Sequence, residues 1–217
     1  MIRRLDLPDS PEADADARMS APSALRNRDA ILSELRRLAP PSGRALELAS
    51  GTGEHVIAFA RALPDLTWQP TDPDPVRRAS IAAWALLHPA QNLLAPRALD
   101  AARTGWGTEE GPVDLIVLVN LLHLISDAEA RIVLAEMAAA LAPGGRALIY
   151  GPFLRDGQPT SDGDAAFHDS LRAQDPAIGY KDLADVSACL RDAHLDLAET
   201  VAMPANNLML VADRPQS

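Results

Sequence analysis

A short apolar segment of this chain runs directly into a loop with two glycines and then into a helix. The segment reads Leu46-Glu47-Leu48-Ala49-Ser50-Gly51-Thr52-Gly53, and residues 54–63 read as the helix that follows. Glycine has no Cβ, so Gly51 and Gly53 let the backbone turn sharply and approach a ligand closely. The first N–H groups of a helix that begins at such a loop face that ligand. This order of strand, loop and helix predicts an α/β fold with the loop as a candidate binding site.

Apolar and helical segments alternate along most of the chain. The predicted strands are 44–49, 66–71, 93–99, 113–120 and 146–151, and the predicted helices among them are 54–63, 75–87 and 127–141. Such an alternation predicts a parallel sheet with helices on both faces, which is a three-layer α/β sandwich. Two more helices are expected at 164–173 and 181–193. The strand-like runs 195–203 and 208–213 are joined by only Pro204-Ala205-Asn206-Asn207, which requires antiparallel pairing. We therefore expect a mostly parallel seven-stranded sheet that ends in an antiparallel hairpin.

Length and composition favour one compact domain. The chain has 217 residues, of which 47% are hydrophobic, and this is enough for a well-buried core over residues 23–217. Ser23 is expected to cap a helix that runs to about Leu38 and opens this domain. Residues 1–22 are rich in Asp, Ala and Pro and contain few large apolar side chains. That composition predicts a flexible N-terminal arm.

Charge and cysteine content exclude several classes of function. The net charge of −10 argues against nucleic acid as a partner, because phosphate contacts need clustered Lys and Arg. Cys189 is the single cysteine, so the sequence has neither an intrachain disulfide nor a multi-cysteine zinc site, and no metal is expected. The sequence contains neither an apolar run of about 18 residues nor a basic-then-apolar leader. We therefore expect a cytoplasmic protein that does not associate with membranes.

Polar residues follow several predicted strands, and ligands of open α/β sheets bind at the carboxyl ends of strands. Asp72 lies 21 positions after Gly51 (72 − 51), close to the roughly 20 expected of an acid that accepts hydrogen bonds from ribose hydroxyls. The alternative is that Asp72 only begins the next helix. Asn120 and His123 follow the fourth strand and could orient a nucleophile or accept its proton, because histidine titrates near neutral pH. A purely structural histidine is the alternative.

The residues around the glycines distinguish two classes of cofactor. The dinucleotide motif G-x-G-x-x-G would need a third glycine at Val56. Here Glu47 precedes the glycines in the order acid-x-small-x-Gly-x-Gly. This order resembles the first motif of the class I S-adenosylmethionine-dependent methyltransferases, with Ala49 where a glycine is usual. The terminal hairpin also resembles that Rossmann-like methyltransferase fold, whose last strand is antiparallel.

Further motifs narrow the resemblance and extend over nearly the whole chain from Ala21. In order, they are Arg26–Leu32, the glycine loop with His55, Trp68–Asp74, Asn120–His123, Tyr150–Phe153, Thr160-Ser161, Ser170–Arg172, Asp175-Pro176 and Met203–Leu208. Together they look like a family of small methyltransferase-like proteins carried as a domain of unknown function. The chain departs from that family's pattern at Ala30, Gly163 and His168, and these changes leave the implied cofactor site intact.

The resemblance implies a set of cofactor-binding residues and a smaller catalytic set. The expected cofactor-binding residues are Arg26, Asn27, Glu47, Ala49, Ser50, Gly51, Thr52, Gly53, His55, Asp72, Asp100 and Asn120. Asp100 lies where methyltransferases place an acceptor for the adenine amino group, and Arg26 suits a bidentate bond with the cofactor carboxylate. The expected catalytic residues are His123, Asn120 and Tyr150, with His55 as a second candidate for proton removal. Methyl transfer depends mainly on the placement of the nucleophile.

The expected function is therefore S-adenosylmethionine-dependent methylation of an unidentified small molecule. One alternative is a methyltransferase-like protein that binds the cofactor or its product without turnover. The other is an NAD(P)-dependent oxidoreductase, which the missing third glycine and the terminal hairpin disfavour. The sequence leaves the acceptor atom and the oligomeric state open.

Overall fold

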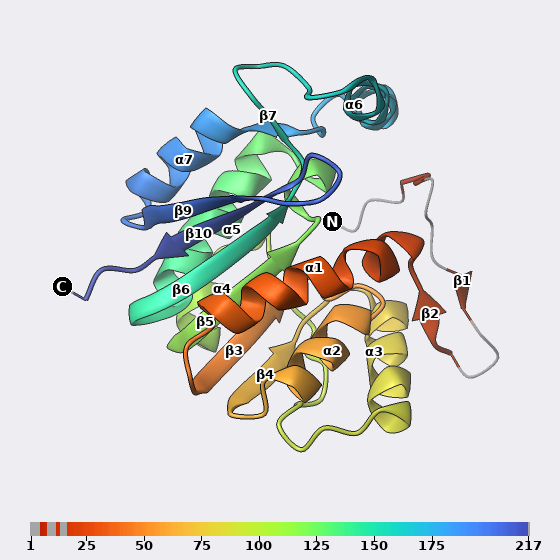
Figure 1. Cartoon of the computed structure of the whole chain (residues 1–217), viewed down its shortest axis with the longest axis vertical. Helices are drawn as coiled ribbons and strands as arrows, with labels where there is room; N and C mark the ends of the chain where they lie inside the picture. Colours follow the sequence, from red (N-terminus) through yellow and green to blue (C-terminus); the bar gives the residue numbers. More distant parts are fainter. Residues whose placement is uncertain (1–4, 8–11, 14–16, 217) are drawn as a thin grey trace. The chain divides into compact units, whose positions relative to one another are not determined.

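The computed structural model describes residues 5–7, 12–13 and 17–216, and these group into two compact units. The first unit contains the described residues up to Asp100 together with Val113–Val117, and the second contains Ala101–Pro112 and the chain from Leu118 onward. The main sheet has six strands in the order β4-β3-β5-β6-β10-β9 (Figure 1). It is a mixed α/β structure with a C-terminal antiparallel hairpin, so the predicted fold class is confirmed. Within the described residues, no helix is both long and apolar enough to cross a membrane.

The first unit alternates strands and helices, beginning with a short pair of strands. Its elements are β1 (Glu12–Ala13), β2 (Met19–Ser20), α1 (Pro22–Leu38), β3 (Gly43–Leu48), α2 (Glu54–Ala62), β4 (Leu66–Pro70), α3 (Pro75–Leu87) and most of β5 (Val113–Val119). β3 and β4 pair in parallel, and α2 packs against both α1 and α3. Helix α1 begins at Pro22 rather than at the predicted cap Ser23, because proline fits the first position, where no N–H bond is needed.

The main sheet has six strands and not the expected seven, because the predicted strand 93–99 does not form. In the described chain this segment forms only isolated bridges, between Leu93 and Trp68 and between Arg97 and Thr71. Pro96 lies between the two bridging positions and has no N–H to donate to a strand ladder. The segment therefore follows the edge strand β4 without becoming a continuous strand.

The second unit contains the rest of the alternation and the terminal hairpin. Its elements are α4 (Trp106–Glu110), the end of β5, η1 (Leu122–Leu124), α5 (Asp127–Ala140), β6 (Leu141–Gly151), β7 (Phe153–Leu154), α6 (Asp162–Gln174), β8 (Lys181–Asp182), α7 (Leu183–Asp192), β9 (Asp196–Ala202) and β10 (Leu208–Asp213). β10 pairs antiparallel with β6 on one side and with β9 on the other. The hairpin turn has Ala205 at φ 55° and Asn206 at φ 59°, in the left-handed region that asparagine tolerates well.

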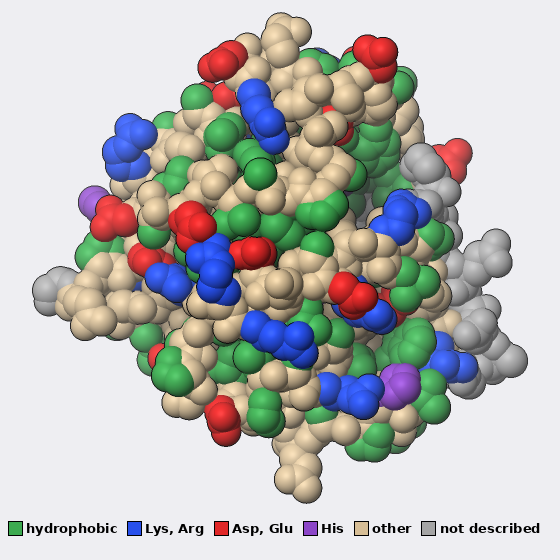
Figure 2. Space-filling model, viewed as in Figure 1, with side chains coloured by type: hydrophobic (Ala, Val, Ile, Leu, Met, Phe, Trp, Pro, Cys, Tyr) green, Lys and Arg blue, Asp and Glu red, His purple; other side chains and the backbone are tan. Residues whose placement is uncertain are grey.

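Acidic and basic side chains are interspersed on the face of the molecule that Figure 2 shows, with hydrophobic side chains between them. Several ion pairs join neighbouring charges, among them Arg146 with Asp213 at 2.6 Å and Arg37 with Glu34 at 2.8 Å. Exposed pairs of this kind contribute about 0–1 kcal/mol each.

Candidate active site

The glycine loop between β3 and α2 has the left-handed backbone that its sequence predicts. Ala49 has φ 50°, Gly51 has φ 57° and Gly53 has φ 97°. A Cβ on Gly53 would lie 2.9 Å from the Cα of Ile81 in α3, so glycine is required there both by its φ and by the close approach of the helix. The residues of the first motif therefore form a tight turn packed onto α3.

Three N–H groups of this loop, those of Ser50, Gly51 and Gly53, are bonded within the protein. Gly51 donates to Oδ2 of Asp72 at 3.0 Å, Gly53 donates to the carbonyl oxygen of Ser50 at 3.1 Å, and Ser50 donates to the carbonyl oxygen of Thr71 at 2.7 Å. The hydroxyl of Ser50 donates in turn to the carbonyl oxygen of Glu47 at 3.3 Å. These bonds fix the loop to the end of β4 and use the N–H groups that a phosphate cradle would require.

Two buried carboxyl groups lie beside the loop. Glu47 is 2% exposed and Asp72 is 4% exposed. Burial, with a smaller contribution from the charge of Asp72, raises the pKa of Glu47 to about 8 although a hydrogen bond from Ser50 lowers it. The pKa of Asp72 is also raised by burial, against the lowering effects of the Asp74 N–H, Arg77 and the Gly51 N–H. Oε2 of Glu47 is buried without a hydrogen-bond partner, and such an unpaired atom at a candidate site calls for a functional explanation.

Asn27 of α1 and His55 of α2 form a buried pair. Oδ1 of Asn27 lies 2.8 Å from Nε2 of His55, so the neutral imidazole carries its proton on Nε2 and donates it to the amide oxygen. Burial, and secondly the positive charge of Arg28, lower the pKa of His55 to about 4. His55 also stacks on Phe59 with 5.7 Å between the ring centroids. Arg26, one residue before Asn27, is exposed on the surface of α1.

In the second unit, Asn120 and His123 come together near Gly151 at the end of β6. Asn120 has φ 56°, and its N–H donates to the carbonyl oxygen of Tyr150 at 2.9 Å. A Cβ on Gly151 would lie 3.7 Å from Oδ1 of Asn120 and 3.9 Å from Nδ1 of His123. Burial, followed by the charge of Lys181, lowers the pKa of His123 to about 3, so its ring is neutral at physiological pH. The side chain of Tyr150 is buried.

Residues of α6 and the following loop surround His123, and the sequence reasoning did not single out most of them. Phe167 and Tyr180 each present their rings edge-on to His123, with centroids 5.9 Å and 6.0 Å away. Lys181 is buried, and its Nζ donates to the carbonyl oxygens of Ile125 at 2.7 Å and Gly179 at 3.1 Å and pairs with Asp127 at 3.1 Å. The lone Tyr180-Lys181 dipeptide carries no spacing signal that could have pointed to these contacts.

The hydroxyl of Tyr180 connects this group to the start of α6. It donates to Oδ1 of Asp164 at 3.3 Å, and the other oxygen of Asp164 accepts from Thr160, Ser161 and the amide of Asn206. Burial opposes ionisation of Asp164, but these hydrogen bonds outweigh it and lower its pKa. The hairpin turn that carries Asn206 is thereby fastened to α6.

Most of the predicted site residues therefore occupy two groups, one in each unit. The first unit holds Glu47, the loop Ala49–Gly53, Asp72 and the Asn27–His55 pair, while the second holds Asn120, His123 and Tyr150. Asp100 is partly buried at the end of the segment that follows β4. The roles assigned to all of these residues remain predictions. Within the described residues, no cluster of three His, Cys, Asp or Glu side chains could hold a metal ion.

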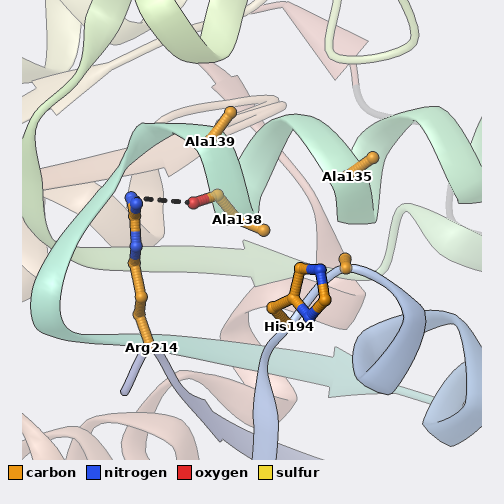
Figure 3. Close-up of a pocket in the computed structure, with 6 residues that line it drawn as sticks. Ala135, Ala138, Ala139, His194 and Arg214 are labelled. Carbon is orange, nitrogen blue, oxygen red and sulfur yellow. Dashed lines mark hydrogen bonds between the residues drawn. The ribbon is translucent and has the colours of Figure 1, made fainter. Parts of the chain in front are cut away.

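An open hollow of about 270 Å³ lies elsewhere in the second unit (Figure 3). Its lining consists of Ala135, Ala138, Ala139, Ala193, His194 and Arg214. The guanidinium of Arg214 donates to the carbonyl oxygens of Ala138, at 3.2 Å, and Leu141. Arg214 therefore satisfies carbonyl groups at the end of α5 and has a structural role there.

Several solved structures similar to this chain are methyltransferases. One is an O-methyltransferase family protein from Burkholderia thailandensis, with a TM-score of 0.74 and 22% identity over 87% of this chain and 55% of that chain. Another is a mitomycin 7-O-methyltransferase, with a TM-score of 0.75 and 16% identity over 89% of this chain and 55% of that chain. A third is human N-acetylserotonin methyltransferase, solved in complex with S-adenosylmethionine. Its TM-score is 0.72 and its identity 15%, over 89% of this chain and 53% of that chain. This chain thus spans little more than half the length of each of these proteins. At these identities the likeness establishes the fold, which is that of the class I methyltransferases.

A family model agrees with the residue motifs found in the sequence. The model is described as a protein of unknown function (DUF938), and it matches residues 18–214. Since that match extends over nearly the whole chain, this protein belongs to the DUF938 family.

Proposed function

We propose that this chain is an S-adenosylmethionine-dependent methyltransferase that acts on a small molecule. The observation that carries the proposal is the glycine loop, whose Gly51 and Gly53 N–H groups are bonded internally beside the buried Glu47 and Asp72. A pyrophosphate would need free N–H groups there and would be repelled by the carboxylate of Asp72. A cationic sulfonium, in contrast, gains from nearby negative charge. The loop therefore supports the adenosyl cofactor over NAD(P).

The donor and acceptor atoms of the first unit fit such a cofactor. Each oxygen of Asp72 accepts one backbone N–H, from Gly51 or Asp74, and retains a lone pair for a ribose hydroxyl. Oε2 of Glu47, without a hydrogen-bond partner among the described residues, offers an oxygen that can form a hydrogen bond next to the loop. The remaining cofactor contacts are proposed for Ala49, Ser50, Thr52, Gly53, His55, Arg26, Asn27, Asp100 and Asn120. The cofactor, when bound, supplies a methyl group already activated by its positive sulfur.

The second unit provides groups that can orient a methyl acceptor. The neutral ring of His123 can accept a hydrogen bond from an acceptor hydroxyl, and Oδ1 of Asn120 lies on the same side of Gly151. The low pKa of His123 makes it a weak base, so we assign it to orientation more than to proton removal. Tyr150 remains a candidate for the same role. Placing the acceptor in line with the methyl group would supply much of the rate.

A protein that binds the cofactor without turnover is the second candidate function. The observation in its favour is that burial depresses the pKa of both His55 and His123, and the side chain of His55 already bonds to Asn27. This alternative predicts tight cofactor binding with no methylation of any acceptor, and an unaltered cellular function in His123→Ala.

We further propose a small-molecule acceptor and a cytoplasmic location.

Calorimetric titration with S-adenosylmethionine, S-adenosylhomocysteine and NAD tests the proposal. We expect both adenosyl ligands to bind at micromolar strength or better and NAD not to bind. In Asp72→Ala the affinity should fall by roughly 1–3 kcal/mol, since the ribose acceptors and the Gly51 anchor are both lost. The exposed Asp65→Ala is the matched control and should bind as the wild type does. Binding of NAD alone would reverse the assignment.

A further inference from the structure

Glu54, the first residue of α2, joins the glycine loop to the chain segment that precedes α1. Its side chain is buried and accepts three hydrogen bonds. The hydroxyl of Ser20 donates to Oε1 at 2.9 Å, while the N–H of Ala21, at 2.9 Å, and the hydroxyl of Thr52, at 3.0 Å, both donate to Oε2. One carboxylate therefore holds two residues before α1 and one residue of the loop.

A second side chain makes the same connection from α3. The N–H of Met19 donates to Oγ of Ser80 at 2.8 Å, and this hydroxyl donates to the carbonyl oxygen of Thr52 at 2.8 Å. Nε1 of Trp84 donates to the carbonyl oxygen of Met19 at 2.8 Å. Thr52 is thus held through its hydroxyl by Glu54 and through its carbonyl by Ser80, and both of these side chains also hold the segment Met19–Ala21.

The same segment leads directly into the helix that carries Asn27. Asn27 bonds to His55, the residue after Glu54, so the connection continues into the second turn of α1. Ala49 has φ 50°, a strained conformation that persists only where surrounding contacts enforce it. Contacts that hold Thr52 between the two glycines fix a later part of the same loop, and they reach it from residues 19–21.

We propose that Met19–Ala21 is a strap that closes on the glycine loop, and that Glu54 is the positioning residue through which the strap fixes the loop for the cofactor. This inference rests on the proposed function. A loop held in its binding conformation loses less entropy when a ligand binds. Conversely, a bound cofactor that fixes the loop stabilises the closed strap, because the two are parts of one hydrogen-bonded network.

The variants Glu54→Gln and Glu54→Ala separate this role from a general loss of structure. In Glu54→Gln, the amide oxygen can take the place of Oε2 and accept from Ala21 and Thr52, while the NH₂ group donates to the hydroxyl of Ser20. The network then survives without its charge. In Glu54→Ala all three bonds are lost. Ser20→Ala is a milder second variant, since it removes one bond from the strap only.

Two readouts follow these variants. The first is the Kd and dissociation rate of S-adenosylmethionine, measured alongside the Tm of each variant. The second is the rate of tryptic cleavage after Arg18, the residue before the strap, with and without the cofactor. We expect the cofactor to slow cleavage in the wild type and in Glu54→Gln. In a folded Glu54→Ala or Ser20→Ala protein, cleavage should be faster, and Kd should rise about tenfold and about threefold respectively.

The outcomes distinguish this inference from the proposed function. A wild-type protein that does not bind S-adenosylmethionine overturns the proposed function and the strap's role with it. A wild-type protein that binds, together with folded Glu54→Ala and Ser20→Ala variants of unchanged Kd and unchanged cleavage, overturns the strap alone. Equal weakening in Glu54→Gln and Glu54→Ala would also overturn it, because the charge and not the network would then be responsible.

Discussion

At the scale of single residues, burial shifts the pKa values of several side chains at the candidate site. Sequence spacing singled out Glu47, His55 and His123, because an acid before the glycines and histidines beside predicted strand ends are visible in the sequence. Their charge states were not visible, because they depend on residues far along the chain, such as Asp72 beside Glu47 and Lys181 beside His123. Tyr180 and Lys181 were missed for the same reason, since only folding brings them to His123.

Glu47→Gln should stabilise the protein increasingly as the pH rises. The pKa of Glu47 is about 8 in the folded chain, against an ordinary value of 4.5, so its favourable burial as a neutral acid is present at low pH and lost as the pH rises through 8. Glutamine stays neutral and keeps the shape of the side chain. Measured by urea unfolding, the stability gain of the variant should grow by about 1.4 kcal/mol per pH unit between pH 5 and 7.5. A gain independent of pH would show that Glu47 is already ionised at low pH.

At the scale of elements, the sequence predicted the bounds of helices and strands well where periodicity and turn residues agree. It predicted them poorly where a single residue or a very short element determines the local structure. β3, the loop and α2 lie within one residue of their predicted bounds. The 93–99 segment failed because Pro96 interrupts an otherwise apolar run, and the five-residue helix α4 is too short to have a recognisable period. The bonding of the loop N–H groups to Asp72 and Ser50 follows from packing of the strand ends, which no local pattern encodes.

Gly53→Ala should destabilise the protein more than Gly105→Ala. Both glycines precede a helix with a similar φ, 97° and 92°, so each alanine pays a similar backbone cost of roughly 1–2 kcal/mol. A Cβ at Gly53 would also lie 2.9 Å from the backbone of Ile81, whereas nothing lies within 4 Å at Gly105. Chemical unfolding should therefore give Gly53→Ala an additional loss of about 1–3 kcal/mol. Equal losses in the two variants would mean that α3 moves away freely.

At the scale of the whole molecule, the fold and family were predictable and the acceptor was not. The alternation of strands and helices and the terminal hairpin are features of the backbone, and the fold is shared with solved methyltransferases of only 15–22% identity. The rings of Phe167 and Tyr180 lie edge-on to His123, and no local sequence motif predicts that they meet there. The motifs leave the identity of the proposed acceptor open, so experiment has to identify it.

The shifted pKa values of His55, His123 and Glu47 together predict a stability maximum at about pH 6.5. The pKa values of His55 and His123 are about 4 and about 3 in the folded chain, below the ordinary 6.5. The stability that these two neutral rings contribute is therefore present above pH 6.5 and lost as the pH falls. Glu47 contributes in the opposite direction, because its pKa is raised. Two histidines outweigh one carboxyl below about pH 6, and the carboxyl dominates above about pH 7.

Urea unfolding at pH 5, 6.5 and 8 measures this profile directly. Replacing both His55 and His123 by Gln should make the stability less dependent on pH below pH 6.5. Glu47→Gln should make it less dependent on pH above pH 6.5. A wild-type stability that rises steadily from pH 5 to pH 8 would contradict the prediction.

The position of β10 has a consequence for synthesis of the chain. β10 pairs with β6 and with β9, so residues 208–213 complete the hydrogen bonding of two strands made before them. During translation, the edges of β6 and β9 that pair with β10 stay unpaired until Asp213 has left the ribosome. A chain truncated before Leu208 would keep these strand edges unpaired, and we expect it to be prone to aggregate.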